Sequence, residues 1–127
     1  MKKIDILILE DDTEALSVIF RVLSQLGEMA EFRPVVLSTY LQVEKLMNDS
    51  DMDFDIILLD RDCALGGSFH TLNIEKFGPE KVIAISMHLP YNEELKKRGV
   101  TKTVLKTVED MRKFEDGLFG EIQRLIT

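Results

Sequence analysis

Two short hydrophobic runs in this sequence each end in acidic residues. Residues 4–9 lead into Glu10 and Asp11, and residues 54–59 lead into Asp60. Short apolar runs of this kind are typical of strands that are buried on both faces of a parallel sheet. Because ligands of such sheets bind just beyond the carboxyl ends of the strands, the pattern predicts a concentrated negative site at one edge of the sheet.

The predicted acidic site requires a compensating cation. Carboxylates that lie close together repel one another and raise each other's pKa unless a cation intervenes. A hard divalent ion such as Mg²⁺ prefers carboxylate oxygens as ligands. The residues at these two strand ends therefore predict a Mg²⁺ site.

Strand-like and helix-like segments alternate along the chain. The predicted strands are residues 4–9, 31–37, 54–59, 81–86 and 102–105. The predicted helices follow caps at Asp12 or Thr13 (to about residue 26) and at Ser38 or Thr39 (to residue 47), and then span residues 70–77, 90–98 and 108–126. This alternation predicts right-handed βαβ units, and hence an α/β sandwich with helices on both faces of a parallel sheet. Pro34 favours an edge position for the second strand.

The composition narrows the class of protein. The length of 127 residues suits one domain spanning residues 1–127, and the net charge of −7 opposes non-specific binding to nucleic acid. The lone Cys63 excludes an internal disulfide and fits a reducing compartment. No apolar stretch approaches the roughly 20 residues that span a bilayer, and the first residues lack a signal-peptide pattern. We expect a cytoplasmic protein that binds neither nucleic acid nor membrane.

Two further strand ends complete a pattern. Ser86 ends the fourth predicted strand, and Lys106 directly follows the fifth. Strand ends that carry Glu-Asp, Asp, Ser and Lys in this order resemble the receiver domain of two-component response regulators, and the resemblance covers essentially the whole chain. It implies a flavodoxin-like, doubly wound five-stranded sheet with the strand order 2-1-3-4-5.

The resemblance also implies a role for each acidic residue. Asp60 would be the phosphoacceptor, a nucleophilic carboxylate that forms an acyl phosphate. Asp11 would bind Mg²⁺ directly, and Glu10 would act through a water molecule. The backbone carbonyl of Asp62 would complete the protein ligands.

The remaining two residues would act on the phosphoryl group. Lys106 would pair with Asp60 and then with a phosphoryl oxygen, and Ser86 would donate its hydroxyl to another phosphoryl oxygen. Such a domain catalyses only its own phosphorylation and dephosphorylation, mainly by positioning and by charge neutralisation. The implied partners are a histidine kinase or phosphotransfer protein and a downstream protein that binds the fourth helix, fifth strand and last helix. The domain would be a monomer or a phosphorylation-dependent dimer.

Several positions depart from the family pattern. Thr107 stands where a proline usually follows the lysine and supports a cis peptide, Thr103 replaces an aromatic residue that takes part in switching, and Met87 stands where a smaller residue is common. The isomer of the Lys106–Thr107 peptide and the switching mechanism are therefore open at the level of sequence.

Two alternative functions remain. A degenerate receiver would act only as a protein-binding module, which the missing aromatic residue and proline favour. The segment Asp60-Arg61-Asp62 also resembles the Asp-x-Asp signature of haloacid-dehalogenase phosphatases, but that signature normally opens a larger, capped fold.

Overall fold

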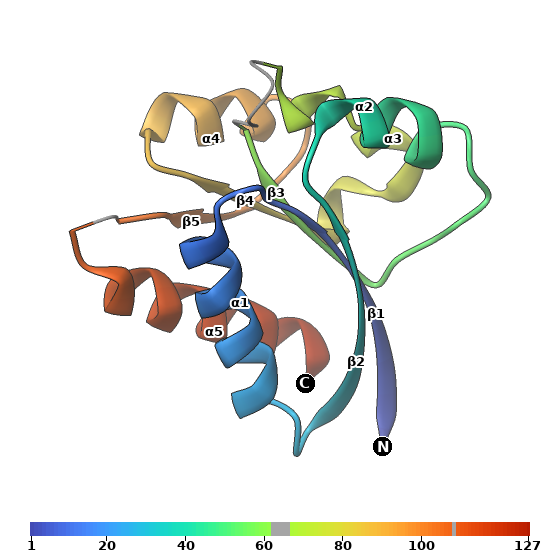
Figure 1. Cartoon of the computed structure of the whole chain (residues 1–127). Helices are drawn as coiled ribbons and strands as arrows, with labels where there is room; N and C mark the ends of the chain where they lie inside the picture. The colour runs from blue at the N-terminus through green and yellow to red at the C-terminus, as the bar shows by residue number, and fades with distance from the viewer. Residues whose placement is uncertain (62–66, 108) are drawn as a thin grey trace.

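The computed structural model describes residues 1–61, 67–107 and 109–127. In these ranges five parallel strands form one sheet in the order β2-β1-β3-β4-β5 (Figure 1). The strands are β1 (Lys2–Leu9), β2 (Ala30–Leu37), β3 (Ile56–Asp60), β4 (Val82–Ser86) and β5 (Lys102–Leu105). The predicted strands and their order are confirmed.

Helical segments connect each strand to the next. They are α1 (Thr13–Gln25), α2 (Tyr40–Gln42), which continues as a π-helical turn (Val43–Met47), α3 (Ile74–Phe77), which lies between two 3₁₀ turns (Phe69–Thr71 and Pro79–Lys81), α4 (Leu89–Lys96) and α5 (Met111–Ile126). The third helix is therefore only one turn of α-helix, shorter than the predicted segment at 70–77.

Local side-chain hydrogen bonds fix where the helices begin. The Asp12 carboxylate accepts a hydrogen bond from the Glu14 N–H at the start of α1, as predicted. The last helix, α5, begins at Met111, later than predicted; residue 108 itself lies outside the described residues. The Asp110 carboxylate accepts hydrogen bonds from the backbone N–H groups of Arg112 and Lys113 and so caps the helix.

The sheet separates two hydrophobic cores. Helices α1 and α5 cover one face, and α2, α3 and α4 lie against the other (Figure 1). Side chains alternate between the two cores along each strand, because successive residues of a strand point to opposite faces. The residues of the first face are Ile4, Ile6, Ile8, Ile56, Leu58, Ile83, Ile85 and Val104. Those of the second face are Leu7, Leu9, Ile57, Leu59, Val82 and Ala84.

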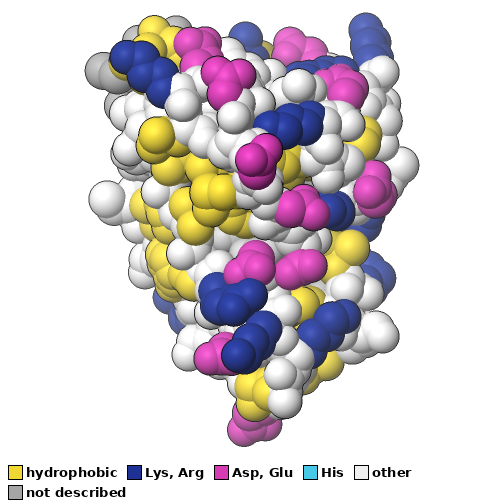
Figure 2. Space-filling view, turned by 90° about the vertical axis from the view of Figure 1, so that its right-hand side faces the viewer, with side chains coloured by type: hydrophobic (Ala, Val, Ile, Leu, Met, Phe, Trp, Pro, Cys, Tyr) yellow, Lys and Arg dark blue, Asp and Glu magenta, His cyan; other side chains and the backbone are white. Residues whose placement is uncertain are grey.

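Strand β2 forms one edge of the sheet, as Pro34 predicted. Figure 2 views the molecule from that side, and hydrophobic side chains gather in the middle of this face with acidic and basic side chains around them. Val36 of β2 is 37% exposed. Pro34 has no N–H group, so it interrupts the row of donors by which another strand could extend the sheet.

The part of the chain that the structure describes contains no helix that is long and apolar enough to cross a membrane.

Two glycines inside α5 differ in what surrounds them. A Cβ atom added at Gly120 would lie 3.5 Å from an Arg124 nitrogen, whereas one added at Gly117 would lie 3.2 Å from Val104 Cγ1. Glycine costs about 1 kcal/mol relative to alanine in a helix interior. We therefore expect Gly120→Ala to raise the free energy of unfolding by about 1 kcal/mol. Gly117→Ala should gain clearly less, because α5 must move from β5. Urea unfolding of both variants checks this, and an equal gain would contradict the close approach at Gly117.

Candidate functional site

Three charged residues at strand ends lie on the same face of the sheet as the alternate hydrophobic side chains that precede them in their strands. By alternation, Glu10 extends the β1 row of Ile8, Asp60 extends the β3 row of Leu58, and Lys106 extends the β5 row beyond Val104. All three therefore belong to the face that α1 and α5 cover. The register places Leu9 opposite Leu59, so that Glu10 and Asp60 leave neighbouring strands at the same level.

The Lys106 ammonium bridges the two carboxylates. Its Nζ atom lies 2.8 Å from Glu10 Oε1 and 2.9 Å from Asp60 Oδ2. The exposed fractions are only 1% for Glu10, 4% for Asp60 and 6% for Lys106. The Lys106 backbone N–H also donates to the Ser86 carbonyl at 2.7 Å, which continues the β4–β5 ladder and fixes the base of the lysine. The site is therefore a buried, hydrogen-bonded ion cluster.

Burial shifts the pKa of Glu10. Loss of hydration is the largest cause, and the adjacent Asp60 carboxyl acts in the same direction. Lys106 opposes them, but the pKa of Glu10 is still raised to about 9. One Glu10 oxygen, Oε2, is buried without a hydrogen-bond partner among the described residues. A second cation beside Glu10 would satisfy this oxygen and favour the ionised carboxylate.

Lys106 remains charged in this environment. Burial would lower the pKa of its ammonium group, but the charges of Glu10 and Asp60 and the hydrogen bonds to both outweigh burial and raise the pKa. Two carboxylates face one fixed ammonium, so this part of the site retains an excess of acidic groups.

The same carboxylates have the chemistry of a divalent-metal site. Glu10, Asp11 and Asp60 each offer an oxygen atom within 4.8 Å of the others. Hard oxygen donors with this charge suit Mg²⁺ and related divalent ions. The oxygen set and the unpartnered Glu10 Oε2 fit such an ion, and Asp11, which is less buried than Glu10, lies on the open side of the cluster.

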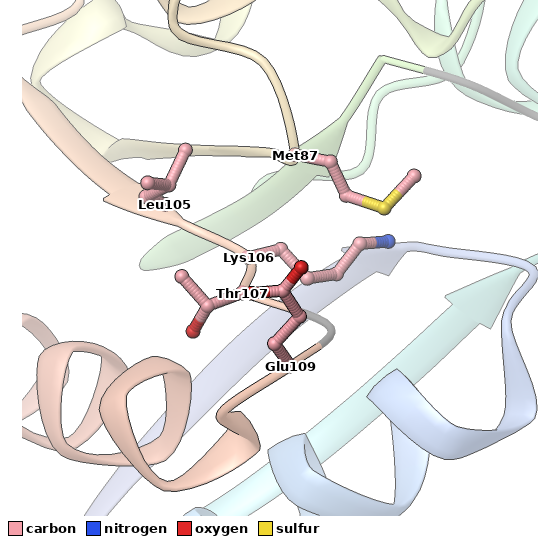
Figure 3. Close-up of a pocket in the computed structure, with 5 residues that line it drawn as sticks. All are labelled: Met87, Leu105, Lys106, Thr107 and Glu109. Carbon is pink, nitrogen blue, oxygen red and sulfur yellow. The ribbon is translucent and has the colours of Figure 1, made fainter.

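A cavity opens onto this cluster. It has a volume of about 190 Å³ and is lined by Asp11, Asp12, Asp60, Met87 and Lys106. Met87 and Lys106 also line a second cavity of about 230 Å³ (Figure 3). Their side chains extend in the same direction, and Met87 is 46% exposed. The entrance to the carboxylates therefore has one apolar wall.

Ser86 lies at the same edge of the sheet but in the other row. Alternation along β4 places it with Val82 and Ala84, on the face opposite Asp60. Its hydroxyl oxygen accepts a hydrogen bond from the His88 N–H at 3.0 Å. The structure therefore brings Glu10, Asp60 and Lys106 into direct contact and engages the Ser86 hydroxyl with the β4–α4 loop. The predicted ligand role of the Asp62 carbonyl falls outside the described residues.

Sequence reasoning gave no role to Arg61, which contacts Asp60 directly. Its backbone N–H donates to Asp60 Oδ1 at 2.8 Å. Both Asp60 oxygens thus accept hydrogen bonds, one from Arg61 and one from Lys106. The donor is a backbone group, and the residue type at position 61 gives no signal for it.

The departures from the family pattern have structural outcomes. No cis peptide bond occurs among the described residues, and the Lys106–Thr107 peptide is trans. The Lys106 ammonium reaches Asp60 with Thr107 in place of proline. Thr103 is half-buried and lines a groove between β5 and α5.

Comparisons with known proteins identify the fold. No protein-family model and no curated protein matches the sequence. Among solved structures, TrrA, a response regulator from Thermotoga maritima in complex with Mg²⁺ and BeF, shares 18% identity over 98% of this chain and 99% of its own, with a TM-score of 0.69. The phosphorylated cyanobacterial phytochrome response regulator RcpA shares 16% identity over 98% and 95%, with a TM-score of 0.72. The non-phosphorylated HemR receiver domain from Leptospira biflexa shares 20% over 97% and 94%, with a TM-score of 0.67.

These similarities define the class of structure. The chain has the receiver-domain fold, with the flavodoxin-like strand order 2-1-3-4-5 and helices on both faces of the sheet. The predicted fold class is confirmed.

The Glu10 pKa predicts how stability depends on pH. The pKa of Glu10 is raised in the native state from its ordinary value of 4.5 to about 9. The free energy of unfolding should therefore fall as the pH rises from about 7 to about 8.5 in EDTA. The slope should correspond to the release of at most about one proton on unfolding. The lowered pKa of His70 acts below 6.5, and the raised pKa of Lys106 acts above 10.5, so neither contributes in this window.

Urea unfolding at several pH values measures this slope. Glu10→Gln should flatten it, and saturating Mg²⁺ should do the same because the cation takes the place of the proton. An identical slope in Glu10→Gln would show that Glu10 is not the titrating group.

Removal of the central ammonium should destabilise the protein. Lys106→Met leaves Glu10 and Asp60 buried without their cation, and breaking a buried ion pair in this way costs about 3–5 kcal/mol. Mg²⁺ should restore more stability to this variant than to the parent. The exposed Lys97→Met is the matched control and should change the free energy of unfolding by no more than about 0.5 kcal/mol. Equal effects of the two substitutions would contradict the role of Lys106.

Proposed function

We propose that this chain is a receiver domain that accepts a phosphoryl group on Asp60. The observation that carries the proposal is the bridge from Lys106 to Glu10 and Asp60, with Asp11 completing a set of oxygens that suits a divalent cation. The cavity beside Asp60 gives a donor access to the carboxylate. The receiver-domain fold supports the same assignment.

The proposed reaction is a transfer of one phosphoryl group. An Asp60 carboxylate oxygen attacks phosphorus and forms a P–O bond, while the P–N bond of a phosphohistidine or the P–O bond of a small acyl phosphate breaks. The electron pair of the broken bond leaves with the donor. Lys106 stays beside Asp60 and offsets the negative charge of the incoming group. Mg²⁺ held by Glu10, Asp11 and Asp60, with the Asp62 carbonyl as a further ligand, would supply additional charge neutralisation.

Ser86 would act after transfer. Its oxygen accepts from the His88 N–H and its O–H remains available as a donor, but the side chain lies in the row opposite Asp60, so it must turn to donate to a phosphoryl oxygen. This movement would link the chemical state of Asp60 to the start of α4.

The product would act as a signal and not as a turnover intermediate. The aspartyl phosphate adds negative charge and strong acceptor oxygens at the sheet edge. The donor would be a histidine kinase or phosphotransfer protein. The output would be a contact with another protein through α4, β5 and α5, in the cytoplasm, by a monomer or a phosphorylation-dependent dimer. The net charge of −7 argues against nucleic acid as the direct target.

Incubation with acetyl phosphate and Mg²⁺ tests this function. We expect intact-mass spectrometry to detect the addition of one phosphoryl group, which is lost in EDTA and in Asp60→Asn because no nucleophilic carboxylate remains. Asp116→Asn, an exposed substitution on α5, is the control and should behave like the parent.

Other results would support the alternatives. No adduct with fresh donor and Mg²⁺, together with partner binding that survives in Asp60→Ala, would indicate a degenerate receiver. Multiple turnover of a generic phosphomonoester would indicate a phosphatase.

A further inference from the structure

The ring of Tyr91, in the first turn of α4, lies against two side chains from other segments. The Arg61 guanidinium carbon is 4.0 Å from the centre of the ring, in a cation–π arrangement. The His88 ring meets the Tyr91 ring edge-on, with 5.3 Å between the ring centres. Tyr91 is thus in contact with the residue after β3 and with a residue of the β4–α4 loop.

Both of these contacts lead back to the proposed site of phosphorylation. The Arg61 backbone N–H donates to Asp60 Oδ1 at 2.8 Å, and the His88 backbone N–H donates to Ser86 Oγ at 3.0 Å. The side chains of Arg61 and His88 therefore both contact the Tyr91 ring. The backbone N–H of Arg61 bonds to Asp60, and that of His88 bonds to the Ser86 hydroxyl oxygen. Within the described chain, this forms a continuous set of contacts from Asp60 and Ser86 to α4.

Arg61 also approaches the next turn of α4. Its Nε atom is 3.7 Å from a Glu94 carboxylate oxygen, and the same oxygen is 3.3 Å from His70 Nδ1. Residues three apart lie on one face of a helix, so Tyr91 and Glu94 present a ring and a carboxylate side by side. The guanidinium therefore contacts two side chains that lie about one turn apart on α4.

We propose that Tyr91 is the positioning residue that couples Asp60 to α4, through Arg61 and His88. The inference rests on the proposed function. Thr103 lacks the ring that receiver domains use at that position, and here the aromatic ring belongs to α4 itself. The coupling joins the site to the helix without an aromatic residue on β5.

Phosphorylation would disturb both contacts at once. Whichever Asp60 oxygen forms the P–O bond, the carboxylate charge that the Arg61 N–H bonds to is lost, and that hydrogen bond weakens. The phosphoryl charge also attracts the Arg61 guanidinium, which would move away from Tyr91 and Glu94 toward the phosphoryl group. When the Ser86 hydroxyl turns toward the phosphoryl group, it leaves the His88 N–H. Tyr91 therefore changes its surroundings on two sides.

The chain offers a direct probe of this change. It has no tryptophan and two tyrosines, so Tyr40→Phe leaves Tyr91 as the single fluorescent tyrosine. Acetyl phosphate and Mg²⁺ are added to the Tyr40→Phe protein, and intact mass gives the phosphoryl occupancy. Tyrosine emission and amide hydrogen exchange of residues 89–96 give the response of α4. The same measurements follow on Arg61→Gln in this background, at matched occupancy, with Lys97→Gln at the C-terminal cap of α4 as the charge-matched control.

We expect phosphorylation to change both the emission and the exchange in the parent and in Lys97→Gln. In Arg61→Gln at equal occupancy both changes should be at least about threefold smaller, since the cation–π contact is gone. Tyr91→Leu, read by exchange alone, should show the same loss.

The outcomes separate the two proposals. A phosphorylated parent whose Tyr91 emission and α4 exchange stay constant overturns the coupling and leaves the function intact. An undiminished response in Arg61→Gln and Tyr91→Leu overturns it as well. Absence of any phosphoryl adduct in the parent overturns the proposed function and the coupling with it.

Discussion

The buried ammonium of Lys106 between Glu10 and Asp60 is the interaction on which the site depends. Two acidic groups at this depth need a cation beside them to ionise, since an unpaired buried charge is expensive. One ammonium does not saturate them: Glu10 keeps an oxygen without a partner among the described residues, and its pKa is raised to about 9. The protein thus holds a site that is folded around one positive charge and is chemically suited to receive a second.

Strand register and alternation make this arrangement possible. Leu9 pairs with Leu59, and the next residue of each strand is a carboxylate on the same face. Lys106 directly follows β5, so its side chain must pass the end of β4 to reach Asp60 on β3. The backbone bond from the Lys106 N–H to the Ser86 carbonyl holds the lysine at the right level for that reach. A slip of one residue in β5 would direct the ammonium to the opposite face.

These features explain which predictions could be made from the sequence. Runs of apolar residues located all five strands, and the strand-end residues located Glu10, Asp60 and Lys106, because strand direction and alternation are local properties. The same alternation would have placed Ser86 in the opposite row. The start of α5 was missed because the Asp110 side chain caps the helix there, and α3 is short because 3₁₀ turns flank it. Contacts made by loops, such as that of Arg61 with Tyr91, depend on the packing of distant segments. No periodic pattern of residues in the sequence predicts them.

The position of Arg61 joins the chemistry of the site to the packing of the helix. Its backbone is constrained by Asp60, the residue before it, and its side chain is constrained by α4. If the hydrogen bond between the Arg61 backbone and Asp60 changes, the Arg61 backbone moves. Its side chain must then change its contact with α4. The contact with Tyr91 is partly exposed, so it is weak enough to be exchanged for a stronger electrostatic partner. A rigid strand end and a partly exposed side chain together supply the two alternative arrangements that a switch requires.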